Sequence, residues 1–256
     1  MTAPLFFAGA SELRGASIGD VIELGGAEGR HAATVRRLVA GEKLDLADGE
    51  GLVCAAEVTA VLPHGLQARV LTRTQFPPPT PRITVVQALA KGDRDERAVE
   101  TMTEVGVDVI VAWQASRSVV RWDAERAQKG DVRWRAVARE AAKQSRRVWV
   151  PELVSLQSTE QVIALLSASV ASGAQVVVLH ESADTPLTGA PVTRSAGGAA
   201  DVVLVVGPEG GITPDEVAAF EAVGAAVRRL GPSVLRTSTA GTVAAAIVLA
   251  NSGRWS

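Results

Sequence analysis

The sequence predicts an α/β protein with a small β-rich N-terminal unit and a larger C-terminal domain built on a parallel sheet. Three observations support this division. Short segments up to about residue 74 alternate apolar and polar residues, a proline-rich segment follows, and longer apolar runs then alternate with helical patterns. The chain of 256 residues is 47% hydrophobic, which is enough to bury a core in each part.

Residues 1–75 are predicted to form a small β-barrel, because alternation at 43–46 and 66–70 surrounds a turn signal at Asp48-Gly49. Within it, residues 30–40 predict a short helix that Gly41 ends. The expected inward residues are Val35, Leu38 and Val39, and the expected outward residues are Arg30, His31, Arg36 and Arg37.

The segment Phe-Pro-Pro-Pro-Thr-Pro at 76–81 predicts a stiff, extended linker, so the second domain is expected to span 82–256. Alternating patterns in that domain predict a parallel sheet covered by helices. The expected strands are 83–89, 107–112, 175–179, 201–206 and 226–230, and the expected helices are 95–105, 132–146, 159–168, 214–223 and 240–250.

Capping signals mark two of these helices. Thr213 with Glu216, and Ser158 with Gln161, have the spacing of a capping box. Gly106 and Gly224 are expected to end the preceding helices.

Composition narrows the classes of function. Lys plus Arg number 26 against 28 Asp plus Glu, so the bulk charge does not indicate a nucleic-acid binder, but residues 114–147 carry ten basic against four acidic residues. The single cysteine, Cys54, excludes an internal disulfide and is expected in the core. No apolar run is long enough to span a bilayer, so we expect a cytoplasmic protein with no membrane partner.

Familiar cofactor motifs are missing. His31, His64 and His180 are widely spaced, so no metal site is expected. The chain has no GxxxxGK[ST] motif, and its GPEGG segment does not fit GxGxxG, which argues against a nucleotide-dependent kinase-like enzyme or oxidoreductase that binds ATP or NAD.

Two loops near the C-terminus are the strongest functional signal. An apolar run at 202–206 leads into GPEGGITPDE, and Leu230 leads into GPSVLRTSTAG. In parallel sheets, ligands bind beyond the carboxyl ends of the strands, and glycine lets the backbone approach a ligand closely. These two loops therefore predict a ligand cradle.

A basic stripe is predicted on the helix at 132–146. Arg135, Arg139 and Lys143 recur at four-residue steps and Arg146 follows, while Trp134 falls on the opposite side and is expected in the core. The stripe is either a solvated face or a phosphate-binding surface. We favour contact with RNA, because further arginines lie in the same block, at Arg117, Arg121 and Arg133.

Several segments together resemble one known family. They are GPEGG followed by LGPSVLRTSTA, KGDRDERAVETMTEVGVDVIV, the Ser116-Arg117-Ser118 turn, and the stretch from Arg133-Trp134 to AAKQSR. These segments are similar to those of the bacterial 16S ribosomal RNA uracil-N3 methyltransferases of the SPOUT class. The resemblance extends almost end to end and includes a PUA-like β unit suggested by GRHAATVRRLVAGEKLDLADG.

The resemblance implies an S-adenosylmethionine cofactor, a homodimer and a trefoil knot in the C-terminal part of the α/β domain. The substrate partner that it implies is 16S ribosomal RNA or the small ribosomal subunit. It implies that the cofactor is held by Leu179, His180, Glu181, Gly207, Pro208, Glu209, Gly210, Gly211, Leu230, Gly231, Leu235, Arg236 and Thr237. One departure is Ser238, where the family commonly has glutamate.

Chemistry at N3 of uracil needs a proton acceptor and donors for charge on the neighbouring oxygens. Arg236 or Arg117 is the expected donor, and Glu209 or Glu181 the expected acceptor. Two structural alternatives stay open: Arg236 holds the loop through a backbone carbonyl, or Glu209 caps the next helix.

The residues expected to contact RNA are Arg30, Arg36, Arg37, Arg117, Arg135, Arg139, Lys143 and Arg146. A protein of this fold that binds RNA or assists ribosome assembly without catalysis is the competing interpretation, which the Ser238 departure leaves open.

Overall fold

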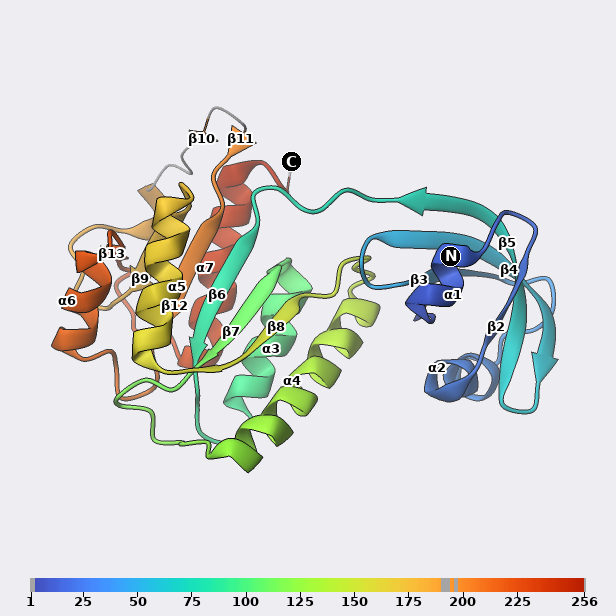
Figure 1. Cartoon of the computed structure of the whole chain (residues 1–256), viewed down its shortest axis with the longest axis horizontal. Coiled ribbons are helices and arrows are strands. Elements are labelled where there is room, and N and C mark those ends of the chain that lie inside the picture. The colour runs from blue at the N-terminus through green and yellow to red at the C-terminus, as the bar shows by residue number, and fades with distance from the viewer. Residues whose placement is uncertain (1–2, 190–193, 196–197, 256) are drawn as a thin grey trace. The chain divides into compact units, whose positions relative to one another are not determined.

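The structure is a computed structural model that describes residues 3–189, 194–195 and 198–255. The chain divides into two compact units (Figure 1). The N-terminal unit comprises Met1–Pro78 with Ala142–Val150, and the C-terminal unit comprises Pro79–Ala141 with Pro151–Ser256. The sequence pattern did not indicate that 142–150 pack with the N-terminal residues.

The N-terminal unit contains one five-stranded mixed sheet in the order β1-β3-β4-β5-β2. The pairing of β1 with β3 is parallel and the other pairings are antiparallel. Its elements are β1 (Leu5–Phe7), α1 (Ala10–Gly15), β2 (Val21–Leu24), α2 (Gly26–Arg30), the π-helical η1 (His31–Val35), β3 (Lys43–Ala47), β4 (Leu52–Leu62) and β5 (Gly65–Gln75). Cys54 is buried in the core of this unit, as expected.

The helix expected at 30–40 was misplaced. Helical structure runs through α2 and η1 instead, and Val35 and Val39 are 68% and 58% exposed, although Leu38 is buried. The helical segment begins at Gly26 and includes Gly29, which packs so closely on β2 that a Cβ atom there would lie 2.0 Å from the Leu24 carbonyl oxygen. After Val35 the chain leaves the helical conformation, and Arg37 has a φ of +53°.

The C-terminal unit contains a six-stranded sheet in the order β13-β9-β12-β6-β7-β8, and every pairing in it is parallel. The predicted parallel α/β sheet of this domain is therefore confirmed. The strands are β6 (Ile83–Ala88), β7 (Val109–Trp113), β8 (Glu152–Gln157), β9 (Gln175–Leu179), β12 (Val202–Val206) and β13 (Ala226–Arg228). Strand β8 was not predicted, because an edge strand is half solvated and carries polar residues.

Five helices surround this sheet: α3 (Arg94–Val105), α4 (Ala124–Gln144), α5 (Thr159–Ala171), α6 (Pro214–Ala222) and α7 (Thr237–Ser252). Between β9 and β12 lie the 3-10 turn η2 (Leu187–Gly189) and the short strands β10 (Arg194–Ser195) and β11 (Gly198–Ala199). Both predicted capping boxes are formed, and Gly106 ends α3 with a φ of +114°. None of the helices in the described ranges combines the length and apolar character that crossing a membrane requires.

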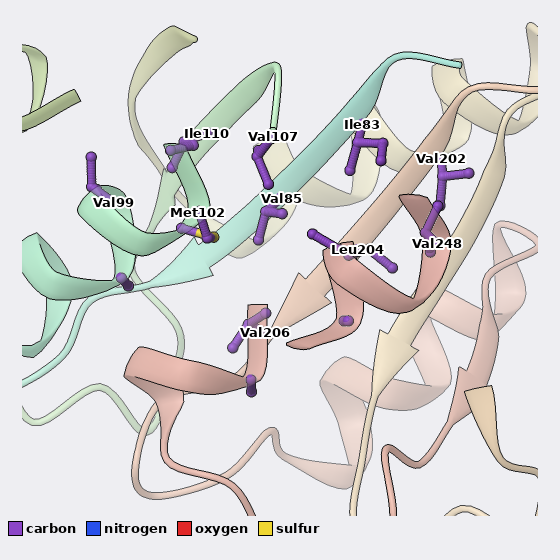
Figure 2. Close-up of a cluster of buried hydrophobic side chains, with 14 of the residues drawn as sticks. Ile83, Val85, Val99, Met102, Val107, Ile110, Val202, Leu204, Val206 and Val248 are labelled. Carbon is purple, nitrogen blue, oxygen red and sulfur yellow. The ribbon is translucent and has the colours of Figure 1, made fainter. Parts of the chain in front are cut away.

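Two cores lie on opposite faces of the sheet. Alternate residues of the central strands face α3, α4 and α7 on one side, where Val85 and Leu204 meet Met102 and Val248 (Figure 2). The intervening residues face α5 and α6 on the other side. Trp134 is 2% exposed in the first core, which confirms its predicted structural role.

Helix α7 returns from the edge strand β13 to pack on β12, β6 and α3. The approach is close, because a Cβ at Gly241 would lie 2.8 Å from the Met102 Sδ. This packing fixes the start of α7 beside the carboxyl end of β12. The trefoil knot that the resemblance implies stays a prediction.

Candidate functional site

A cavity of about 720 Å³ lies at the carboxyl ends of the parallel strands in the C-terminal unit. The segments after β9, β12 and β13 form most of its wall, and Arg94 and Arg117 join it from the segments after β6 and β7. Every residue predicted to hold the cofactor lines this cavity. The two loops that the sequence singled out therefore converge on one site.

The first loop, residues 207–213, depends on glycine for its close approach to other segments. A Cβ at Gly207 would lie 2.6 Å from the Ile212 Cγ1, and one at Gly210 would lie 2.9 Å from the Arg117 carbonyl oxygen. Gly211 has a φ of +74°, and its N–H donates to the Pro208 carbonyl at 2.9 Å. The loop is thus a compact turn at the wall of the cavity.

The second loop, residues 230–237, is joined to the first by a hydrogen bond. The Thr237 hydroxyl donates to the Gly207 carbonyl at 2.8 Å. The Gln87 amide of β6 donates in turn to the Thr237 Oγ1 at 2.9 Å, and Gln87 is fully buried. A polar chain from the middle of the sheet therefore fixes both loops relative to each other.

The third wall segment follows β9. The His180 N–H donates to the Arg228 carbonyl at 2.9 Å, and the His180 Nδ1 lies 2.8 Å from the Ser182 Oγ. The Arg229 guanidinium donates to the Ala183 carbonyl at 3.1 Å. These bonds hold the segment after β9 against the second loop.

Glu209 pairs with α3 rather than capping α6. It accepts from the Arg94 Nη1 at 2.9 Å and from the Lys91 N–H at 3.1 Å. Burial is the largest single influence and raises the pKa of Glu209, but the hydrogen bonds from its own N–H, Arg94 and Lys91 together outweigh burial and lower it. An ionised carboxylate with a lowered pKa is a weak proton acceptor.

Two guanidinium groups remain at the cavity for a ligand. Arg236 is exposed, and within residues 3–189, 194–195 and 198–255 its side chain has no hydrogen-bond or ion-pair partner. Arg117 donates from Nη1 to the Gly210 carbonyl at 3.3 Å, near the limit of a hydrogen bond. The alternative that Arg236 holds the loop through a carbonyl therefore has no support in this geometry.

The residues expected to contact RNA differ in accessibility. Arg30, Arg36 and Arg37 are exposed on the N-terminal unit. Arg135 donates to the Leu153 carbonyl at 2.7 Å while its side chain stays 54% exposed. Lys143 does not fit the prediction, because it is 8% exposed and its Nζ lies 3.2 Å from the Glu28 carboxylate within the N-terminal unit.

Sequence reasoning missed Arg94, Arg229, Ser233 and Val234, which also line the cavity. Arg94 follows the carboxyl end of β6, so the strand-end rule that identified the two loops could have found it. Arg229 directly precedes the loop that was identified. Gln87 gave no signal, since a polar residue inside an apolar strand shows its partner only in the folded protein.

Two domain families match the chain. Residues 77–249 match the RNA methyltransferase domain, and residues 24–71 match the RNA methyltransferase PUA domain. The fold and the site thus define a protein of the RNA methyltransferase class, with a PUA domain preceding the parallel α/β domain.

Comparison with related proteins identifies the family within this class. The ribosomal RNA small subunit methyltransferases E of Mycobacterium bovis and Bacillus subtilis are 49% and 31% identical, over 93% and 84% of this chain and 89% and 84% of theirs. The chain belongs to the ribosomal RNA small subunit methyltransferase E family. A Legionella pneumophila structure with the bound cofactor S-adenosylmethionine has a TM-score of 0.82 at 26% identity, covering 98% of both chains.

Replacing Thr237 with valine should test the link between the loops. The change keeps the shape but leaves the buried Gln87 amide with only the Ala88 carbonyl as an acceptor, and it leaves the Gly207 carbonyl without the Thr237 donor. We expect the free energy of unfolding in urea to fall by about 1–3 kcal/mol.

Thr239→Val is the matched control, because Thr239 lies in the same helical turn and its hydroxyl is exposed. It should change the free energy of unfolding by less than about 0.5 kcal/mol. Equal stability changes in the two variants would contradict the structural role of Thr237.

Proposed function

We propose that this chain transfers a methyl group from S-adenosylmethionine to N3 of a uridine in 16S ribosomal RNA. The observation that carries the proposal is the convergence of both glycine loops on one cavity beside Arg117 and Arg236. Membership of the ribosomal RNA small subunit methyltransferase E family supports the RNA substrate. The choice of N3 rests on the resemblance of the motifs.

The cavity fits a nucleoside cofactor. Its volume of about 720 Å³ lies within the usual range for small-molecule sites, roughly 300–1,000 Å³. A Cβ at Gly207 or Gly210 would collide with Ile212 or Arg117, so the compact shape of the loop at the cavity wall requires glycine at both positions. The Legionella structure, which holds S-adenosylmethionine, has the same fold over nearly the whole chain.

S-adenosylmethionine, when bound, supplies an electrophilic methyl group, so the protein mainly has to orient the acceptor nitrogen. Arg236 and Arg117 lie at the cavity and donate to the uracil oxygens, where charge builds as N3 loses its proton. Glu209 is the weaker candidate for the proton acceptor because Arg94 pairs with it. Glu181 is the better candidate for the proton acceptor, because it is exposed and lines the same cavity.

The RNA substrate is bound through arginines of both units. In the N-terminal sequence these are the exposed Arg30, Arg36 and Arg37, and in the basic stripe they are the exposed Arg135 and Arg146 with the half-buried Arg139. The protein acts as a homodimer, as the resemblance implies, and its place is the cytoplasm, as composition predicts. Light scattering that found only monomer would contradict the dimer.

Incubation with small subunits that lack the modification tests the function. With S-adenosylmethionine carrying a deuterated methyl group, nucleoside mass spectrometry should detect labelled 3-methyluridine. Arg236→Ala should lower kcat on the order of 100-fold, as the loss of an oxyanion donor does. The control Arg126→Ala removes an exposed arginine outside the cavity and should keep full activity.

Binding without any methylated product would favour the non-catalytic RNA-binding or assembly protein. Calorimetry with S-adenosylmethionine, NAD and ATP completes the test, since tight binding of NAD or ATP alone would contradict the assigned cofactor.

Charge reversal at Arg36 and Arg37 tests the RNA surface. If both arginines neutralise phosphates, the slope of log affinity against log salt should become shallower by about one unit for each phosphate that is no longer neutralised. Fluorescence anisotropy with labelled RNA over a salt series measures this slope. An unchanged slope would exclude RNA docking at these two residues.

A further inference from the structure

The Glu216 carboxylate collects hydrogen bonds from three separate segments. Its Oε2 accepts from the Thr213 N–H at 2.9 Å and from the Thr213 hydroxyl at 3.0 Å. Its Oε1 accepts from the Ser116 N–H at 2.9 Å and from the Thr159 hydroxyl at 3.1 Å. The residue is 4% exposed. A capping box requires only the bonds to Thr213, so the second oxygen has another role.

The second oxygen connects strand ends that lie far apart in the sequence. Ser116 follows β7, Thr159 begins α5 after β8, and Glu216 itself lies just beyond the first cofactor loop. Burial is the largest influence on the pKa of Glu216 and raises it, but the hydrogen bonds from Thr213 and Ser116 together outweigh burial and lower it. The group is therefore a carboxylate at neutral pH, when its charge strengthens these bonds.

Ser116 directly precedes Arg117, whose backbone rests on the cofactor loop. A Cβ at Gly210 would lie 2.9 Å from the Arg117 carbonyl oxygen and 3.0 Å from its Cβ. The Ser118 N–H donates to the Ala115 carbonyl at 3.0 Å and closes a tight turn around Ser116 and Arg117. The Glu216 bond thus holds one end of the turn that presents the Arg117 guanidinium to the cavity.

We infer that Glu216 is a positioning residue for methyl transfer, whose carboxylate holds the 116–118 turn so that Arg117 faces the substrate base. The inference rests on the proposed function, because Arg117 is the group through which Glu216 acts. A carboxylate that only capped a helix would have no part in turnover, whereas the inferred role gives Glu216 such a part.

Ser116→Pro removes the Ser116 groups that donate to Glu216. Ser116 is the second residue of the turn, a position where proline is favoured, and the capping box with Thr213 stays intact. Glu216→Gln removes the charge and replaces one acceptor with a donor. Each variant is expected to lower kcat on the order of tenfold, while the Kd for S-adenosylmethionine changes less than about threefold.

A double-mutant cycle with Arg117→Ala separates positioning from general stability. If Glu216 acts through Arg117, adding Ser116→Pro or Glu216→Gln to Arg117→Ala should lower kcat by less than about twofold more. Glu221→Gln is the control, because Glu221 is exposed on the same helix. It should leave kcat unchanged.

Equal fold-losses with and without Arg117, or a fully active Ser116→Pro variant, would overturn the inference. If Glu216→Gln does not fold, Ser116→Pro decides the matter by itself, and circular dichroism identifies that case. The wild-type reaction separates this test from the proposed function. Absence of product from the wild type contradicts the function, whereas normal wild-type turnover with an unaltered Ser116→Pro kcat contradicts only the role of Glu216.

Discussion

The hydrogen bond from the Thr237 hydroxyl to the Gly207 carbonyl is the interaction on which the site depends. It ties together two loops that leave different strands, and the buried Gln87 amide holds Thr237 in place. Because these groups are buried, each needs its partner, and removing one leaves another unsatisfied. A buried residue in the middle of the sheet is thus linked to both loops of the cavity wall.

The parallel direction of the strands brings the other segments of the cavity wall together. All strands of the C-terminal sheet share one direction, so the segments after β6, β7, β9, β12 and β13 meet at one edge. Two carboxylates position arginines at the cavity. Glu209 pairs with Arg94, and Glu216 holds the turn that carries Arg117. Arg236 stays available at the cavity. The result is a backbone cradle with directed positive charge beside it, which suits transfer of a methyl group to a base that must lose a proton.

Local signals predicted much of this arrangement. The Thr213 and Ser158 capping boxes, the strands that precede the two loops and the buried Trp134 all follow from short sequence patterns, and the structure confirms them. Features that depend on tertiary contacts could not be predicted from the sequence. Gln87 looks like an anomaly in a strand until Thr237 is beside it, and Lys143 looks like part of a basic stripe until Glu28 pairs with it.

The clearest error concerns the helix expected at 30–40. The helical segment begins at Gly26 instead and includes Gly29, whose contact with the Leu24 carbonyl needs a residue without a side chain. Gly207 and Gly210 were correctly placed in a loop, because a strand and a helix start bracket them, and close contacts with Ile212 and Arg117 exclude a Cβ at both. The structural role of a glycine can thus be predicted only where the residues that it contacts in the fold can be inferred from the sequence around it.

Hydrogen exchange followed by mass spectrometry, with and without S-adenosylmethionine, tests the central claim most directly. If the two loops enclose one ligand as a joined unit, peptides covering 207–213 and 230–237 should both exchange more slowly with the cofactor present. Protection of only one loop, or of neither, would contradict the account.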